Sequence, residues 1–233
     1  MPRETNAAKR ERAIETCRRL NERYGPVECF LDHETPFRLV IAVLLSAQTT
    51  DAQVNKVTPE LFRRWPTPEQ MAGATYEELS DVIKSLGFYK TKAKHCIACA
   101  QMIVADYGGV VPNEMKELVK LPGVGRKTAN IVLNVGYGIV DGIAVDTHVN
   151  RIAHRLKLSP KTHEKEPLKT EQDLLKILGL DVEHAAHRER GRALEVPDVA
   201  DGGRQLDVAH ALAAHLGRGH LDAAALADDA LET

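Results

Sequence analysis

The sequence lacks several features that would define a class of protein. It contains no run of about 18 apolar residues, so no segment is expected to span a membrane. Its first residues, 1–6, are polar and have no apolar stretch of the kind that a secretory signal needs. We therefore expect a cytoplasmic protein.

Cysteine is scarce, since the 233 residues hold only four, at positions 17, 29, 96 and 99. Without a secretion signal, a disulfide framework is not expected. Cys96 and Cys99 form a CxxC pair, but it lies in an amphipathic helical stretch and has no second pair to complete a metal site. We therefore interpret this pair as helix packing and favour that reading over a metal or redox role.

Aromatic residues and lysine are missing from the last part of the chain. No aromatic residue follows Tyr137, and no lysine follows Lys176. Residues 179–233 carry five arginines and eleven acidic residues, a net charge of −6, whereas the whole chain has −2. The difference leaves +4 on residues 1–178, and a mildly basic body suits contact with phosphate. We interpret 179–233 as an atypical acidic tail.

The remaining sequence predicts helices throughout. Short amphipathic stretches are separated by Gly, Pro and residues that commonly cap helices, and no convincing pair of alternating strands occurs. Helix starts are expected at Thr35-Pro36, Thr50 with Gln53, Thr67-Pro68 with Gln70, Thr75 with Glu78, Asn113 and Asp146. Helix ends are expected at Gly87 and at Gly108-Gly109. The pattern predicts an all-α fold.

The sharpest motif is LPGVGRKTAN, at residues 121–130. Its Gly-Val-Gly sequence is predicted to form a turn between two helices, where glycine permits unusual backbone angles and close approach by another molecule. The turn leads into a helix N-terminus, whose N–H groups can bind a DNA phosphate without any base being read. An ordinary helical hairpin with a glycine turn is the alternative.

Lys127 and Asp146 are the candidate catalytic residues. Lys127 is predicted to start the helix after the turn, where the positive helix end and Arg126 disfavour an ammonium. A neutral amine could attack an electrophilic sugar carbon. Asp146, 19 residues further on, is a plausible helix N-cap, and its carboxylate could also take a proton from Lys127 and stabilise a cationic sugar. A solvated lysine and a simple helix cap are the alternatives.

Together these segments resemble the endonuclease III family of DNA-repair enzymes. LPGVGRKTAN followed by AVDTHV is similar to the core signature of that family. LLSAQTTD, at residues 44–51, is similar to its SAQxTD segment, and Gly87-Phe88-Tyr89 followed by Lys92-Ala93 to its GxY…KA loop and helix. The resemblance runs from about residue 8 to residue 178.

The resemblance implies a two-domain helical DNA glycosylase fold with a helix-hairpin-helix motif and a DNA cleft between the domains. A six-helix domain would span residues 30–138, with the helix-hairpin-helix motif at 113–136. Residues 1–29 plus 139–178 would form the second helical domain. The tail at 179–233 would replace the region that holds a metal cluster in the family.

The resemblance also implies an activity and a site. The family members are bifunctional DNA N-glycosylases and AP lyases that remove oxidised pyrimidines and cut 3′ to the abasic site by β-elimination. By this resemblance Lys127 is the nucleophile, Asp146 the essential aspartate, Gln48 the residue that fills the gap in the duplex, and Phe88 an apolar wedge. Further DNA contacts would come from the turn: Gly123, Val124, Gly125 and Arg126. The expected partner is duplex DNA with a damaged base or abasic site. We expect the chain to act as a monomer and not to associate with a membrane.

The sequence departs from the family after about residue 178. The family usually carries four cysteines, spaced C-x6-C-x2-C-x5-C, that bind a [4Fe–4S] cluster, but here no cysteine follows Cys99. No metal or cofactor is therefore expected in this chain. An Ala/Arg/Gly/His/Asp-rich tail is what a shifted reading frame of GC-rich coding sequence would give, and sequencing the gene tests this hypothesis. A natural cluster-free variant is the competing account.

Several other functions compete with the bifunctional enzyme. The chain could be a non-catalytic helix-hairpin-helix DNA-binding protein, a monofunctional glycosylase for alkylated or mismatched bases, or the inactive product of a frame-shifted gene. Lys127 and Asp146 together favour the bifunctional enzyme, because DNA binding alone does not require that pair. Borohydride trapping distinguishes the monofunctional enzyme from the bifunctional one, because a monofunctional glycosylase forms no covalent adduct with DNA.

Overall fold

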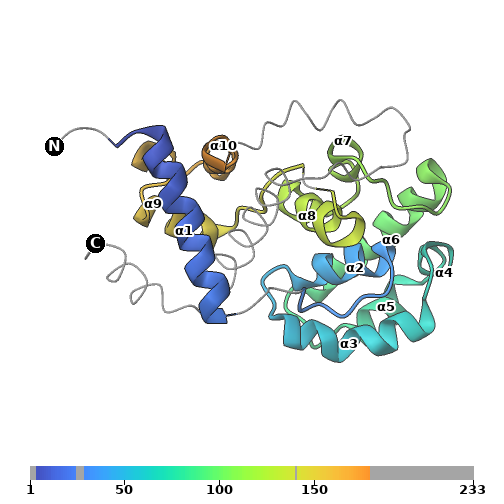
Figure 1. Ribbon diagram of the computed structural model, residues 1–233. Helices are drawn as coiled ribbons and strands as arrows, with labels where there is room; N and C mark the ends of the chain where they lie inside the picture. The colour runs from blue at the N-terminus through green and yellow to red at the C-terminus, as the bar shows by residue number, and fades with distance from the viewer. Residues whose placement is uncertain (1–3, 25–28, 140, 179–233) are drawn as a thin grey trace. The chain divides into compact units, whose positions relative to one another are not determined.

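The computed structural model describes residues 4–24, 29–139 and 141–178 (Figure 1). Helices and loops make up these residues, with no strand among them, which confirms the all-α prediction. They divide into two compact units: one is Glu28–Ile139, and the other joins the described residues of Met1–Val27 with those of Val140–Thr233. None of the helices in the described ranges is long and apolar enough to cross a membrane. The predicted tail, with the hypotheses on its origin, lies outside the described residues.

The unit Glu28–Ile139 is built around one apolar helix, α2 (Pro36–Ser46), in which eight of eleven residues are buried. A helix that is apolar on nearly every side must be surrounded by other elements. Its neighbours in contact include α3, α6, α8 and the π-helical turn η1. The other elements of this unit are α3 (Asp51–Arg64), α4 (Pro68–Ala72), α5 (Tyr76–Val82), α6 (Tyr89–Tyr107), α7 (Met115–Leu118), α8 (Arg126–Ile131) and η1 (Val132–Gly136).

Cys96 and Cys99 lie in the core of this unit, on the inner face of α6. Burial raises the pKa of the Cys99 thiol to about 12 and raises that of Cys96 as well. A neutral, buried thiol behaves as a small apolar side chain. The structure therefore agrees with the interpretation that this CxxC pair packs the helix.

Several predicted helix boundaries are confirmed. Thr35 caps α2, because its hydroxyl accepts a hydrogen bond from the Arg38 N–H at 3.2 Å. Thr75 and Glu78 form a reciprocal capping box at the start of α5. Gly108 ends α6 in the left-handed conformation, with φ of 59°. In each case the cap is a local interaction that short-range sequence pattern specifies.

One predicted helix start is confirmed without its predicted cap, and two other boundary predictions are wrong. Helix α3 begins directly after Thr50, as predicted, but the Thr50 hydroxyl makes no cap and the Gln53 N–H donates to the Thr50 carbonyl instead. Asn113 does not cap a helix, since α7 begins after Glu114, whose carbonyl accepts from Glu117 and Leu118. Gly87 does not end α5, which stops at Val82 and is followed by a series of turns.

The second unit is formed by α1 (Asn6–Tyr24), α9 (Thr147–Arg155), the 3₁₀ turn η2 (Lys161–His163) and α10 (Pro167–Leu178). Within it, α10 contacts both α1 and α9. Helical spacing puts Ala13, Cys17 and Leu20 on one face of α1, and all three are buried. Their core partners on the other helices are Val149, Ala153, Leu174, Leu175 and Leu178.

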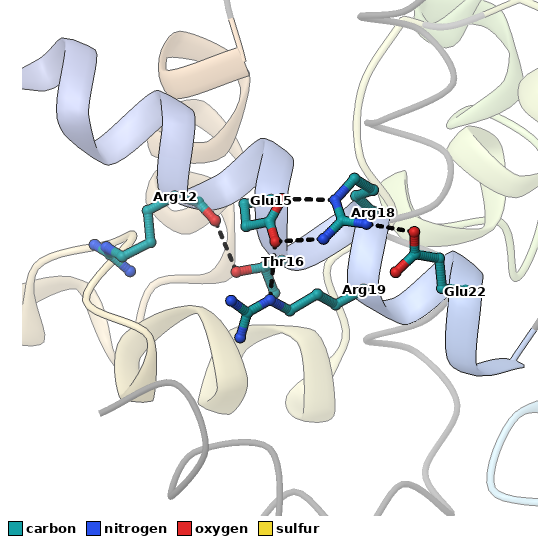
Figure 2. A network of polar contacts seen from close by, with 6 residues as sticks. All are labelled: Arg12, Glu15, Thr16, Arg18, Arg19 and Glu22. Atoms are coloured by element: carbon teal, nitrogen blue, oxygen red, sulfur yellow. Dashed lines mark hydrogen bonds and ion pairs between the residues drawn. The ribbon is translucent and has the colours of Figure 1, made fainter. Parts of the chain in front are cut away.

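The solvent face of α1 carries a chain of ion pairs (Figure 2). The Glu15 carboxylate accepts from Arg18 at 2.7 Å and from Arg19 at 2.9 Å, and Arg18 also contacts Glu22. These side chains are about half exposed, so solvent screening leaves each pair with little effect on stability. Two of the five arginines of α1, Arg18 and Arg19, are thus paired with glutamates of the same helix.

A buried polar network fixes α9 against α10. The Thr170 hydroxyl donates to the Asn150 side-chain carbonyl at 2.6 Å, and the Asn150 amide donates to the backbone carbonyl of Glu164, also at 2.6 Å. Ser159 donates to the Asp173 carboxylate at 2.6 Å. Buried groups satisfied in this way hold a single arrangement. They set the orientation of α9, whose first turn begins at Asp146.

Candidate active site

The predicted helical hairpin is present between α7 and α8. Gly123 adopts φ of 80°, a left-handed conformation that favours glycine. A Cβ atom there would lie 2.8 Å from the Leu44 Cδ2 atom and 2.9 Å from the His95 Nδ1 atom. The turn therefore packs directly against α2 and α6, and only glycine fits at its tip.

Gly125 is different, because no contact among the described residues requires a glycine at this position. Its φ is −91°, and a Cβ atom built on it would meet no atom within 4 Å. The residue is exposed and immediately precedes α8, whose first residue, Arg126, is half-buried. Space is therefore left beside this turn for an approaching molecule.

Lys127 is the second residue of α8, and it is exposed. A carboxylate at the start of α3, Asp51, lies within reach of its charge. Partial burial raises the pKa of Asp51, and the positive charge of Lys127 acts in the opposite direction. An amine and a carboxylate are thus brought within electrostatic range of each other inside one unit.

Gln48 and Phe88 share an unusual backbone conformation. Their φ angles are 54° and 57°, and among the described residues the only other non-glycine residue with a positive φ is Lys157. Such a conformation costs about 1–2 kcal/mol for an L-residue, so the surrounding structure must impose it. Both residues are exposed, and 67% of the Phe88 surface is accessible.

The loops that carry Gln48 and Phe88 meet. A Cβ atom on Gly87 would lie 3.9 Å from the carbonyl oxygen of Gln48, an ordinary van der Waals distance. The Lys92 ammonium donates a hydrogen bond to the Thr49 hydroxyl at 2.6 Å. The structure thus brings together two residues that the sequence assigned to DNA contact from segments 40 positions apart.

Asp146 caps α9, as predicted. Its Oδ1 atom accepts from the N–H groups of His148, at 2.9 Å, and Val149, at 2.8 Å. The residue is half-buried, and its backbone is extended, as expected for an N-cap. It belongs to the other unit, so its pairing with Lys127 stays a prediction.

Comparison with known proteins decides the family. The model of the HhH-GPD superfamily base excision DNA repair protein matches residues 41–179, which include the hairpin, Lys127 and Asp146. The chain belongs to the HhH-GPD superfamily. The resemblance noted in the sequence is therefore confirmed.

Similar proteins within this superfamily are endonucleases III. The chain is 44% identical to endonuclease III of Synechocystis over 172 residues, which are 74% of this chain and 77% of the relative. It is 52% identical to endonuclease III of Bacillus subtilis over 144 residues, 61% of this chain and 65% of the relative. A solved endonuclease III–DNA covalent intermediate superposes with a TM-score of 0.68 at 40% identity, covering 77% of this chain and 83% of that one.

The cysteines of this HhH-GPD chain do not fit the family's [4Fe–4S] cluster. Such a cluster is held by four thiolates that converge on it. Cys17 lies in the core of one unit and Cys96 and Cys99 in the core of the other, and burial raises the pKa of Cys17 to about 12. Across the described ranges, no group of three or more His, Cys, Asp or Glu side chains is suited to a metal ion.

Sequence reasoning missed two residues of this region, Asp51 and Lys92. Both lie in segments that carried the resemblance, but no role was assigned to them. Lys92 did leave a signal, since it shares the inner face of α6 with Ala93, Cys96 and Cys99, where an apolar residue is expected. Asp51 gave none, because its proximity to Lys127 depends on how α3 and α8 pack.

Proposed function

We propose that this HhH-GPD protein is a bifunctional DNA N-glycosylase and AP lyase that removes oxidised pyrimidines from duplex DNA and cuts 3′ to the abasic site. The observation that carries the proposal is the exposed Lys127 in the first turn of α8, directly after the Gly-Val-Gly turn. A hairpin that only bound DNA would need no primary amine at this position. The endonuclease III relatives support the same assignment.

Binding of DNA begins at the hairpin. A phosphate approaches the open side of Gly125 and accepts hydrogen bonds from the N–H groups at the start of α8. This contact positions the duplex without reading its sequence. Gln48 and Phe88 then enter the duplex: the glutamine fills the space of the extruded nucleotide, and the phenyl ring wedges between bases.

Base removal uses Lys127 and Asp146. The neutral Nζ atom attacks C1′ of the extruded nucleotide, the glycosidic bond breaks, and its electron pair leaves with the base, which takes up a proton. Asp146 accepts the proton lost by the amine and stabilises the positive charge that develops on the sugar. A lesion that stacks or pairs poorly is extruded at lower cost, which favours damaged pyrimidines.

Strand cleavage follows from the same covalent bond. Opening of the sugar ring leaves an iminium, or Schiff base, between Nζ and C1′. This cation acidifies the C2′ proton, and its removal expels the 3′ phosphate by β-elimination. Hydrolysis of the imine then frees Lys127. A related endonuclease III was solved as a trapped covalent intermediate with DNA, and the same kind of intermediate is proposed for this chain.

We further propose that the chain works as a monomer in the cytoplasm. We also propose that it holds no [4Fe–4S] cluster, because Cys17 is buried in the core of one unit and Cys96 and Cys99 in the core of the other. Iron analysis of purified full-length chain tests the last point. An iron content far below one atom per active chain is the expected result. About four iron atoms per chain would contradict it.

The proposed activity is tested by borohydride trapping on duplex DNA with one abasic site. Reduction of the Schiff base should yield a stable protein–DNA adduct with the wild-type chain and none with Lys127→Ala. Lys120→Ala is the matched control, because Lys120 is an exposed lysine near the same hairpin that forms an ion pair with Glu117. That variant should still form the adduct.

The other functions predict different results. Release of a damaged base without any adduct would identify a monofunctional glycosylase. Binding of duplex DNA without base release or adduct would identify a non-catalytic module. Neither binding nor release by a folded chain would match an inactive gene product. Each of these outcomes contradicts the proposal.

A further inference from the structure

Lys92 is a lysine in the core of the unit Glu28–Ile139. Only 5% of its surface is accessible, and its neighbours on the inner face of α6 are apolar. Burial lowers the pKa of Lys92, because a low-dielectric environment disfavours the ammonium. A buried amine is retained only where a specific partner compensates for its lost hydration.

That partner lies next to Gln48. The Lys92 Nζ atom donates to the Thr49 hydroxyl at 2.6 Å, across 43 positions of sequence. The Thr49 hydroxyl lies 3.5 Å from the carbonyl of Ala47, so the lysine meets the turn that forces Gln48 to a φ of 54°. The ammonium therefore holds this turn from inside the unit.

The backbone of Lys92 bonds to the loop that carries Phe88. Its N–H donates to the carbonyl of Phe88 at 3.1 Å and so closes the first turn of α6. Phe88 is the N-cap of that helix and has no side-chain cap of its own. One residue thus bonds to the Phe88 loop through its backbone and to the Gln48 turn through its side chain.

We propose that Lys92 is a positioning residue that locks the Gln48 turn and the Phe88 loop into one rigid probe for duplex DNA. The inference rests on the proposed function, in which Gln48 and Phe88 enter the duplex. The gap that Gln48 would fill and the base stack that Phe88 would enter exist only when the abasic site lies opposite a second strand. Lys92 should therefore matter for duplex substrates and not for the chemistry at Lys127.

The experiment compares borohydride trapping rates on two substrates, duplex and single-stranded DNA with the same abasic site. Lys92→Met keeps the length of the side chain but removes the donor, and Thr49→Val keeps the shape of its partner but removes the acceptor. Thr49→Ser retains a hydroxyl and is the conservative control. Circular dichroism establishes that each variant is folded, and Thr49→Val keeps the test decisive if Lys92→Met does not fold.

Both disruptive variants should slow trapping on the duplex about tenfold or more, a change of about 1.4 kcal/mol, and leave the single-stranded rate unchanged. The double variant should be no slower than Lys92→Met, because the two groups act as one pair. Thr49→Ser should behave as wild type. Equal losses on both substrates would refute the inference, since they would mean a general effect on the fold, and so would unchanged rates on the duplex.

The failure of the proposed function gives a different result. In that case the wild-type chain forms no adduct with either substrate, and the role of Lys92 falls with it. If wild type forms the adduct on both substrates while the Lys92 and Thr49 variants match it on the duplex, only the inference is wrong.

Discussion

Two substitutions at Asp146 separate its role as a helix cap from its proposed role in catalysis. Its Oδ1 atom accepts two backbone hydrogen bonds in the first turn of α9, at 2.9 and 2.8 Å. Asp146→Ala removes this acceptor and should lower the free energy of unfolding by about 1 kcal/mol, the usual cost of losing an N-cap. Asp146→Asn keeps an Oδ1 acceptor and loses only the favourable charge at the helix N-terminus, about 0.5 kcal/mol.

The rate of base release should respond differently from stability, because both variants should slow it to a similar extent. In the proposed mechanism the Asp146 carboxylate takes the proton of Lys127 and stabilises the cationic sugar. Both variants lack this carboxylate, so both should slow base release about 10²-fold or more. The assay is single-turnover release of one oxidised pyrimidine from duplex DNA at saturating protein. Urea unfolding of the same preparations gives the stability change.

The comparison refutes the account if the two properties move together. A nearly wild-type rate for Asp146→Asn, with a slow rate only for the less stable Asp146→Ala, would mean that Asp146 is a cap and nothing more. Thr75→Ala supplies the stability control, because it removes a cap of similar strength at α5. That variant should be less stable and yet release the base at the wild-type rate.

The other predictions compare matched positions. Gly123→Ala should lower the free energy of unfolding by about 1–3 kcal/mol in urea, because its Cβ would lie 2.8 Å from a packed side chain at a φ of 80°. Gly125→Ala, whose Cβ meets nothing within 4 Å, should unfold like wild type but bind duplex DNA more weakly, and the reverse order would contradict the account. Partial burial raises the pKa of Asp51 in the folded state above that in the unfolded chain. Its contribution to stability is therefore fully present below the unfolded-state pKa and is lost as pH rises through the folded-state pKa. Asp51→Asn should therefore be more stable than wild type at pH 7, but not at a pH below the ordinary value of 3.8. In Lys127→Met, carbon NMR titration should show the Asp51 pKa raised further, and an unchanged value would exclude electrostatic contact between the two groups. Thr75→Ala should cost about 1 kcal/mol, whereas Thr50→Ala should cost almost nothing, because Thr50 makes no side-chain cap.

Interactions between residues close in sequence were predictable. Thr35, Thr75 and Asp146 cap helices as expected, because the acceptor and its N–H donor lie within three positions. The hairpin and its glycine turn were predictable for the same reason. Thr50 shows the limit of this reasoning, since its backbone carbonyl replaces the hydroxyl as the acceptor in the first turn of α3.

Contacts between distant segments were not predictable from pattern. The left-handed conformation of Gln48 and Phe88 is imposed by packing, because neither residue favours it intrinsically. The bond from Lys92 to Thr49 joins α6 to the end of α2, and the approach of Lys127 to Asp51 joins α8 to α3. Motif spacing predicted which residues would contact DNA, but it did not predict which residues hold them in place.

Peptide mapping of the borohydride-trapped adduct by mass spectrometry tests the central claim most directly. The trapped chain is digested with protease and nuclease, and the peptide that carries the reduced sugar remnant is sequenced. The account predicts a single modified residue, Lys127, in the peptide that begins α8. Modification at another lysine, or an adduct that persists in Lys127→Ala, would contradict it.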